Sequence, residues 1–336
     1  MMYNGKIIVL AFPDTFVKMS DELMCKILPL MGLGTRTHIK AGHAALVLIE
    51  NETGNAQYFD FGRYITPKGK GRVRGANTDA ELAIPIKAIV KDGVLENLDE
   101  LLVWLDAHPE KTHGSGRLVA SLCSSVYYEK ARDYISFLQN QGSIPYKAFG
   151  NIGSNCARFV TETILAGTTD ASIQKYLKRN KKFTPSTIGN VEKSASEEGV
   201  YQVFDGVITP YNSTALRENL TNYFDKKVPP AHKLEEEINL PKNVQFLNGT
   251  GSSAYFHLEM LSPERGIVRR FTEYGEQDFE GVTIFPEGFS ITEDYDFVYD
   301  SNCAYCTLQQ GDSLFRLELS PQKQTAISLK QTAHSA

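Results

Sequence analysis

The chain has 336 residues, of which 42% are hydrophobic and 22% are charged, and its formal net charge is −5. This composition excludes global disorder, and the acidic balance argues against a nucleic-acid-binding protein, which usually carries a basic domain or stripe. The length favours two domains over one. The five cysteines are an odd number, which argues against a disulfide framework.

The first predicted element is a strand over Gly5 to Pro13. Its apolar stretch is too short for the core of a signal peptide or for a membrane span, and no later stretch could cross a bilayer. We therefore expect a cytoplasmic protein without a transmembrane segment, unless a leader has been removed from the sequence. The oligomeric state does not follow from the sequence.

The next segments predict helices and strands in alternation. Ser20 is the predicted N-cap of a first helix, and the glycine-containing loop Gly32 to Gly42 follows it. "HAALVLIE" and "AQYFDFGRY" predict two strands that a turn over Asn51 to Asn55 joins into a β-hairpin. The later elements are a loop at "GKGRVRG", a strand at "AELAIPIKAIV", a helix capped by Asn97, a strand at "GRLVASLC", a helix ended by Gly142 and a helix over Cys156 to Leu165.

The pattern changes after residue 185. The segment "FTPSTIGNVEKSASEEGV" is rich in small and polar residues and predicts a linker, and "STALRENLTNYFDKK" predicts one more helix. From Asn243 to Leu319, short alternating runs broken by Gly, Pro and Asp predict a β-rich unit. We therefore expect a first domain over residues 1–185 and, over residues 186–336, a linker with a β-rich accessory domain.

Cys156 lies at the junction between the small residues Gly153-Ser154-Asn155 and a predicted helix. The free N–H groups and the partial positive charge of a helix N-terminus favour a thiolate and can bind an oxyanion. Cys156 is therefore a candidate nucleophile, with Ser154 and Asn155 as oxyanion-binding or positioning residues. A small buried packing residue is the alternative interpretation.

A thiol nucleophile needs a base, and His43 is the candidate because it starts a strand directly after Gly42, where the scaffold can hold it rigidly. A strand-end histidine with a satisfied hydrogen bond is the alternative interpretation. The other six histidines fall in the glycine-containing loop, beside a predicted exposed turn, in a connection, in a second-domain strand and in the C-terminal tail: His38, His108, His113, His232, His257 and His334.

"GHAALVLI", followed by a hairpin, and "NCARFV", opening a helix much later, resemble the circularly permuted papain-like enzymes, which include permuted NlpC-type peptidases and lecithin:retinol acyltransferase-like proteins. In that group the histidine precedes the cysteine, as His43 precedes Cys156 here. The resemblance covers roughly residues 1 to 170 and implies an α+β domain in which a small antiparallel sheet packs on helices.

The same resemblance implies a cysteine hydrolase that cleaves an amide bond in a peptide, such as a cell-wall peptide, or in another acyl-containing substrate, through an acyl-enzyme and without a cofactor or metal. Arg158 stands two residues after the cysteine, where the acyltransferase branch has a histidine. This difference argues against a retinoid- or phospholipid-acyltransferase role.

A third residue must orient His43 and fix its tautomer. Asp60 is an acceptor that lies among aromatic residues, where a charge is costly unless it is partnered. A structural ion pair with Arg63 or Arg72 is the alternative interpretation. Counting residues across the hairpin turn places His43 near Arg63 and Asp60 on the opposite face, although a bulge or another turn register would change this. We choose Asp60.

Cys303 and Cys306 form a C-x-x-C pair, which can be a redox motif or half of a zinc site. The predicted strand-and-turn context and the lack of a second pair favour a structural role. Three functions remain open: a cysteine hydrolase, with ester hydrolysis or acyl transfer as variants on the same site; a catalytically silent papain-like binding module; and a thiol-redox or metal protein that uses this pair.

Overall fold

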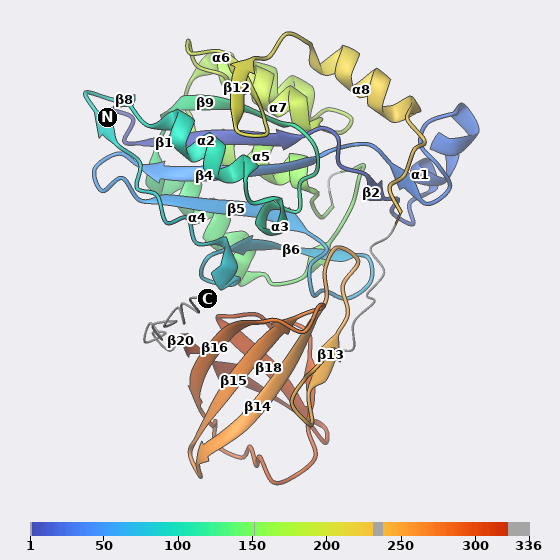
Figure 1. The fold of residues 1–336 in the computed structure, drawn as a ribbon, viewed down its shortest axis with the longest axis vertical. Coiled ribbons are helices and arrows are strands. Elements are labelled where there is room, and N and C mark those ends of the chain that lie inside the picture. The colour runs from blue at the N-terminus through green and yellow to red at the C-terminus, as the bar shows by residue number, and fades with distance from the viewer. Residues whose placement is uncertain (1, 151, 231–237, 322–336) are drawn as a thin grey trace, which may run out of the picture.

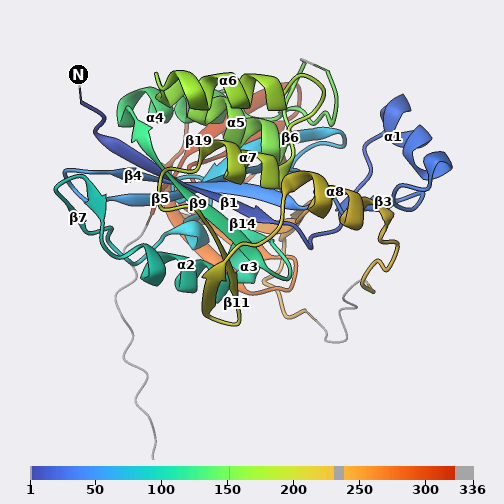
Figure 2. The same ribbon diagram turned by 90° about the horizontal axis from the view of Figure 1, so that it is seen from above.

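The computed structural model describes residues 2–150, 152–230 and 238–321. An antiparallel sheet of eight strands dominates the first part of the chain, and helices cover both of its faces (Figure 1 and Figure 2). In spatial order its strands are β10 (Ile144–Pro145), β6 (Lys70–Gly75), β5 (Ala56–Gly62), β4 (His43–Glu50), β1 (Gly5–Phe12), β9 (Leu118–Val126), β11 (Val200–Phe204) and β12 (Val207–Pro210).

The central strands bury both faces, so their side chains alternate between two cores. On β1, Ile7 and Val9 face one core while Ile8 and Leu10 face the other, and none of the four is exposed. This double burial explains the unbroken apolar run of the first strand. The first core lies under α4 (Tyr128–Asn140), α5 (Cys156–Gly167), α6 (Ala171–Asn180) and α7 (Thr187–Ser194), and the second under α2 (Leu98–Asp106) (Figure 2).

Short elements complete the first part. They are β2 (Val17–Lys18), α1 (Leu23–Ile27), β3 (His38–Ile39), β7 (Val90–Lys91), β8 (Val94–Leu95), α3 (Pro109–Thr112), α8 (Ala215–Phe224) and two 3-10 turns, Leu28–Met31 and Ala80–Leu82. In the described ranges, no helix is both long enough and apolar enough to span a membrane.

The C-terminal part is β-rich, as predicted. A five-stranded and a three-stranded sheet enclose a core that includes Phe256, Val268 and Leu308, all fully buried. The first sheet contains β13 (Gln245–Leu247), β14 (Ala254–Ser262), β15 (Arg265–Thr272), β16 (Gln277–Ile284) and β20 (Ser320–Pro321), and the second contains β17 (Asp296–Val298), β18 (Tyr305–Gln310) and β19 (Ser313–Glu318).

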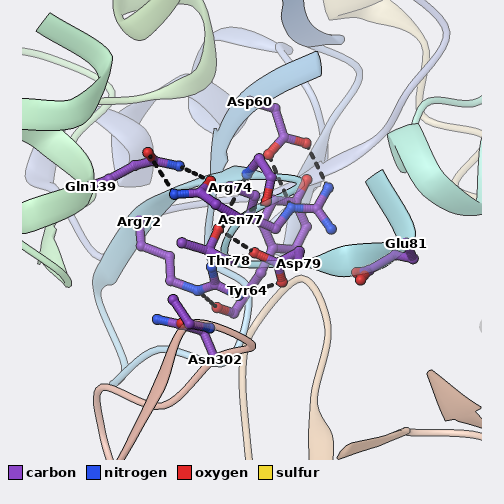
Figure 3. Close-up of polar contacts among 12 residues, drawn as sticks. Asp60, Tyr64, Arg72, Arg74, Asn77, Thr78, Asp79, Glu81, Gln139 and Asn302 are labelled. Atoms are coloured by element: carbon purple, nitrogen blue, oxygen red, sulfur yellow. Dashed lines mark hydrogen bonds and ion pairs between the residues drawn. The ribbon is translucent and has the colours of Figure 1, made fainter. Parts of the chain in front are cut away.

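A buried ion-pair network joins the two parts. Arg270 on β15 is 1% exposed and donates to Asp79 at 3.0 Å and to Glu81 at 2.6 Å. Asp278 accepts from the same guanidinium at 2.9 Å. Asp79 in turn accepts two hydrogen bonds from Arg72 on β6, at 2.6 and 2.7 Å (Figure 3). Buried charges of this kind are tolerated only when each has a partner.

A loop of the C-terminal part packs against the chain just after β5. The N–H of Ile65 donates to the carbonyl of Ser252 at 2.9 Å, and the N–H of Gly251 donates to the carbonyl of Arg63 at 2.9 Å. A Cβ on Gly249 would lie 2.5 Å from the nitrogen of Ile65, so a side chain at that position would prevent this approach.

The predicted linker is wrong for residues 187–194, which form α7. Ile188 and Val191 are fully buried against the sheet. The strand β11, also unpredicted, extends that sheet by pairing with β9. The predicted domain boundary at residue 185 therefore falls between two helices that cover the same face.

Two further predictions on the first part are wrong. "GKGRVRG" is the strand β6 rather than a loop, because its two arginines point inward and are paired there with carboxylates. "AELAIPIKAIV" contains a 3-10 turn and only the two-residue strand β7 at its end.

Both predicted capping side chains bond elsewhere. The Ser20 hydroxyl donates to Glu22 at 2.7 Å, and α1 has no side-chain cap. Asn97 occupies the cap position of α2, but its side chain accepts from the N–H of Ile89 at 2.8 Å instead. His232 and His334 lie outside the described residues.

We predict that Arg270→Met lowers the free energy of unfolding by about 3 kcal/mol, because it leaves the buried carboxylate of Asp79 and the half-buried one of Asp278 short of a partner. Arg265→Met, at an exposed position of the same strand, should change it by less than about 0.5 kcal/mol. Urea unfolding followed by circular dichroism measures both variants. Equal stabilities would contradict a stabilising role for the network.

Candidate active site

Asn155 caps α5, which begins at Cys156. The Asn155 Oδ1 accepts from the N–H of Arg158 at 2.9 Å. Its Nδ2 donates to the carbonyl of Lys147 at 2.8 Å and approaches that of Ala148 at 3.4 Å. The side-chain amide nitrogen is thereby engaged, so these contacts suit a positioning role rather than oxyanion binding by the side chain.

Gly153 and Ser154 fix the chain just before the helix. The N–H of Ser154 donates to the carbonyl of Pro145 at 3.0 Å, and its carbonyl accepts from the N–H of Lys147 at 2.9 Å. Gly153 has a φ of 81°, and a Cβ there would lie 2.1 Å from the Pro145 oxygen, so this turn requires glycine. The Ser154 hydroxyl contacts the neighbouring Asn155 carbonyl at 3.3 Å.

The predicted hairpin of β4 and β5 is present, but its register differs from the residue count. Asp60 pairs with Ala45 and therefore shares a face with His43, so the expectation that Asp60 faces away is wrong. The turn closes with the N–H of Glu50 donating to the carbonyl of Asn55 at 3.1 Å, which moves the pairing by one residue. His43 Nε2 lies 3.4 Å from Asp60 Oδ2.

Asp60 is fully buried, and Arg74 on β6 balances its charge (Figure 3). Arg74 donates to the two carboxylate oxygens at 3.0 and 2.6 Å, and the Tyr58 hydroxyl donates to Oδ2 at 3.1 Å. Burial alone raises the pKa of Asp60, but the Arg74 charge holds it well below its usual range. Arg63 and Arg72, the alternative partners expected from the sequence, donate to other groups.

The charges of His43 and Cys156 are coupled. Burial lowers the pKa of His43, but the hydrogen bonds and charges of Asp60 and Cys156 raise it to about 9. Burial raises the pKa of the Cys156 thiol, but the hydrogen bond and charge of His43 bring it below its ordinary value. The N–H groups of Ala44 and Ala157 contribute to this lowering. The arrangement favours a thiolate–imidazolium pair.

Arg74 and its neighbours were missed from the sequence. Its guanidinium lies 3.7 Å from the centroid of the Tyr64 ring, which stacks on His113 at 4.9 Å. His113 was expected beside an exposed turn, yet burial and the Arg74 charge lower its pKa to about 3, so the ring is neutral. The available signal was the alternate spacing of Arg72 and Arg74, which is typical of two side chains on one face of a strand.

No sequence motif pointed to Tyr146. It lines one cavity with Cys156, and burial, the Cys156 charge and hydrogen bonding to that thiol raise the pKa of the phenol. The ring stacks on Phe61 at 5.9 Å, and the Arg63 guanidinium lies 4.6 Å from its centroid. Tyr146 therefore stays protonated at neutral pH and can donate a hydrogen bond beside the thiol.

A cavity of about 530 Å³ opens beside Cys156. The glycine-containing loop lines it through Leu33, Ile39 and Gly42. A cavity with a largely apolar wall limits the water around the reacting groups, and this strengthens the electrostatic interactions among those groups. Apolar side chains from both ends of the first part complete the wall: Val17, Leu28, Phe149, Phe183 and Leu216.

Cys303 and Cys306 are both buried and free rather than joined in a disulfide. Burial raises the pKa of Cys306 to about 12. In the part of the chain that the structure describes, no three His, Cys, Asp or Glu side chains are grouped so that they could hold a metal ion. The pair thus packs in the C-terminal core, with no feature of a reactive thiol site.

Residues 7–173, slightly less than half of the chain, match the model of a family described as Type VI secretion system effector TseH-like. The candidate site residues lie within this range. Residues 244–320 match a second family, described as the DUF6695 C-terminal domain. The crystal structure of the Type VI secretion system effector TseH matches at 19% sequence identity with a TM-score of 0.41, covering 61% of this chain and 97% of that chain. A comparison with curated proteins finds no match.

We predict that a limiting amount of iodoacetamide alkylates Cys156 before the other thiols at neutral pH, because its pKa is lowered while burial raises those of Cys123 and Cys306 to about 12. His43→Ala should remove this preference, since the imidazolium stabilises the thiolate. His108→Ala, a matched control at the N-cap position of α3, should keep it. Peptide mass mapping locates the label, and equal labelling of several cysteines would contradict the pairing.

Proposed function

We propose that this protein is a cysteine hydrolase that cleaves an amide bond through Cys156, His43 and Asp60, on a papain-like domain of circularly permuted order. The observation that carries the proposal is the 3.4 Å contact between His43 Nε2 and the buried Asp60 carboxylate, at an imidazole whose pKa and that of the Cys156 thiol shift each other. The adjoining cavity supports it, because a substrate needs access to the sulfur. The reaction needs no cofactor.

Acylation begins when the Cys156 thiolate attacks the carbonyl carbon of the scissile amide. A C–S bond forms while the π electrons of the carbonyl move to oxygen. The N–H at the start of α5 and the Tyr146 hydroxyl are the proposed oxyanion donors. Collapse of the tetrahedral intermediate breaks the C–N bond, and the leaving amine takes the proton of the His43 imidazolium.

Deacylation repeats these steps with water as the nucleophile. His43 accepts a proton from water as it attacks the acyl-enzyme, and the thiolate leaves. Asp60 faces Nε2, which leaves Nδ1 for the thiol and for the proton transfers. Arg74 keeps Asp60 ionised, so the imidazolium is stabilised in both half-reactions.

A catalytically silent binding module is the less favoured function. A raised pKa of His43 and a lowered pKa of Cys156 are typical of a reacting pair, and a scaffold has no need of them. The proposed substrate is a peptide, such as a cell-wall peptide. Ester hydrolysis or acyl transfer would use the same residues with a different acyl donor or acceptor.

We further propose that the catalytic domain extends through α8 and that the accessory domain begins near β13. This boundary keeps α7, β11 and the cavity-lining α8 with the sheet on which they pack. The match of residues 7–173 suggests an effector-type enzyme. A delivered effector acts outside the cell that makes it, so the cytoplasmic location stays a prediction.

The protein should release new amino groups from peptides or peptidoglycan fragments. Cys156→Ala should reduce this release by at least about a thousandfold, because no acyl-enzyme can form. Cys123→Ala, a buried thiol on β9 away from the cavity, should retain activity. Mass spectrometry of the products measures all three proteins, and full activity of Cys156→Ala would refute the mechanism.

The pH profile of kcat/KM should fall above the pKa of His43, about 9, where the imidazolium is lost, and below the lowered pKa of Cys156, where the thiolate is protonated. Asp60→Asn removes a charge that raises the His43 pKa, so its alkaline limb should move to lower pH. Tyr58→Phe removes only a neutral contact to the same carboxylate and should move the limb less.

Because Asp60→Asn also leaves Arg74 without its counter-ion, circular dichroism must first show that the variant is folded. A folded variant with an unchanged alkaline limb would mean that Asp60 does not act on His43.

A further inference from the structure

A second cavity, of about 540 Å³, lies where the C-terminal part meets the first sheet. The first part contributes the loop between β5 and β6, and the C-terminal part contributes Asn248, Thr250 and Tyr299. This cavity shares four residues with the cavity beside Cys156, namely Lys18, Met19, Ser20 and Tyr146. The two cavities therefore adjoin.

Tyr146 stands at the junction of the two cavities. It lines the first cavity together with Cys156, while the guanidinium of Arg63 lies over its ring, 4.6 Å from the centroid. Arg63 lines only the second cavity. A substrate that extends from the thiol past this ring therefore meets a cation.

The wall of the second cavity carries unbalanced positive charge. Of its two carboxylates, Asp21 pairs with Lys68 at 3.8 Å, and Glu22 accepts from the N–H of Ala148 at 2.6 Å. Three other cations line the same space. Among the residues that the structure describes, none of them forms an ion pair: Lys18, Arg63 and Lys147.

The wall that the C-terminal part supplies adds neutral donors and no carboxylate. The Tyr299 hydroxyl donates to the carbonyl of Asn248 at 2.7 Å, and the N–H of Gly251 donates to the carbonyl of Arg63 at 2.9 Å. The first bond fixes the loop within the C-terminal part, and the second holds it against the first part. Thr250 is exposed at its tip.

We propose that this interdomain cavity is a subsite that binds a carboxylate of the substrate. The inference rests on the proposed function and narrows its substrate class. The scissile amide lies at Cys156, an apolar part occupies the first cavity, and a carboxylate-bearing part extends past Tyr146 to Arg63 and Lys147. The C-terminal part is then a component of substrate binding.

Two electrophiles of one length test this subsite on the full chain: chloroacetyl-alanyl-alanine, which has a free carboxylate, and its methyl ester. The Cys156 thiolate displaces chloride from either one, forming a C–S bond. Intact-mass kinetics at low ionic strength should show the carboxylate probe reacting about fivefold faster. This advantage should shrink as salt screens the cations.

Variants distinguish two causes of a faster reaction of the carboxylate probe: binding at the subsite, and the general attraction of the His43 imidazolium for anions. Lys147→Gln and Arg63→Gln should each reduce the rate ratio of the two probes, because they slow the carboxylate probe more than the methyl ester. Thr250→Glu, at an exposed position of the opposite wall, should lower the ratio by repulsion. Lys178→Gln, a matched control on α6 outside both cavities, should keep the wild-type ratio.

Equal rates for the two probes in the wild type, or a ratio that all three cavity variants leave unchanged, would overturn the subsite while the labelling of Cys156 still supported the hydrolase. Failure of both probes to label Cys156 would overturn the proposed function itself. Because two of the variants lie in the first part and one in the C-terminal part, misfolding of a single variant leaves the result interpretable.

Discussion

The buried ion pair between Asp60 and Arg74 is the interaction on which the candidate site depends. A carboxylate without exposed surface is stable only beside a counter-ion, and here the same carboxylate also faces His43. Asp60 and Arg74 are cross-strand partners on β5 and β6, so sheet register sets their geometry. The carboxylate that faces the imidazole thus lies on β5, a strand paired on both sides within the eight-stranded sheet.

Local signals made Cys156 and His43 candidates, because a helix start after small residues and a strand start after glycine are both short-range patterns, and the resemblance to permuted papain-like enzymes joined them as a pair. The partner of His43 was harder to derive. One residue of turn length decides which face Asp60 occupies, and the composition of the turn does not determine that length. Arg74 could be placed beside Asp60 only if β6 was predicted as a strand, and the glycines and arginines of β6 are typical of a loop.

The polar composition of α7 predicted a linker. That prediction is wrong because the polar side chains bond to another helix. Asn190 is fully buried, donates to the carbonyl of Ala157 at 2.7 Å and accepts from the Thr161 hydroxyl at 2.7 Å. Both of these partners lie on α5, the helix that begins at Cys156. A polar composition that predicts an exposed linker in isolation therefore satisfies buried groups once the two helices pack.

The ion pair between Arg270 and Asp79 also constrains how this architecture can be inherited. The two parts match separate families, so each is a unit that recombination can move. A crossover between α8 and β13 would take Asp79 from one parent and position 270 from the other. A partner without a cation there would leave the buried Asp79 with part of its charge uncompensated. A stable fusion therefore needs a cation at position 270 together with the carboxylate of Asp79. This requirement makes the two otherwise exchangeable parts evolve as one unit.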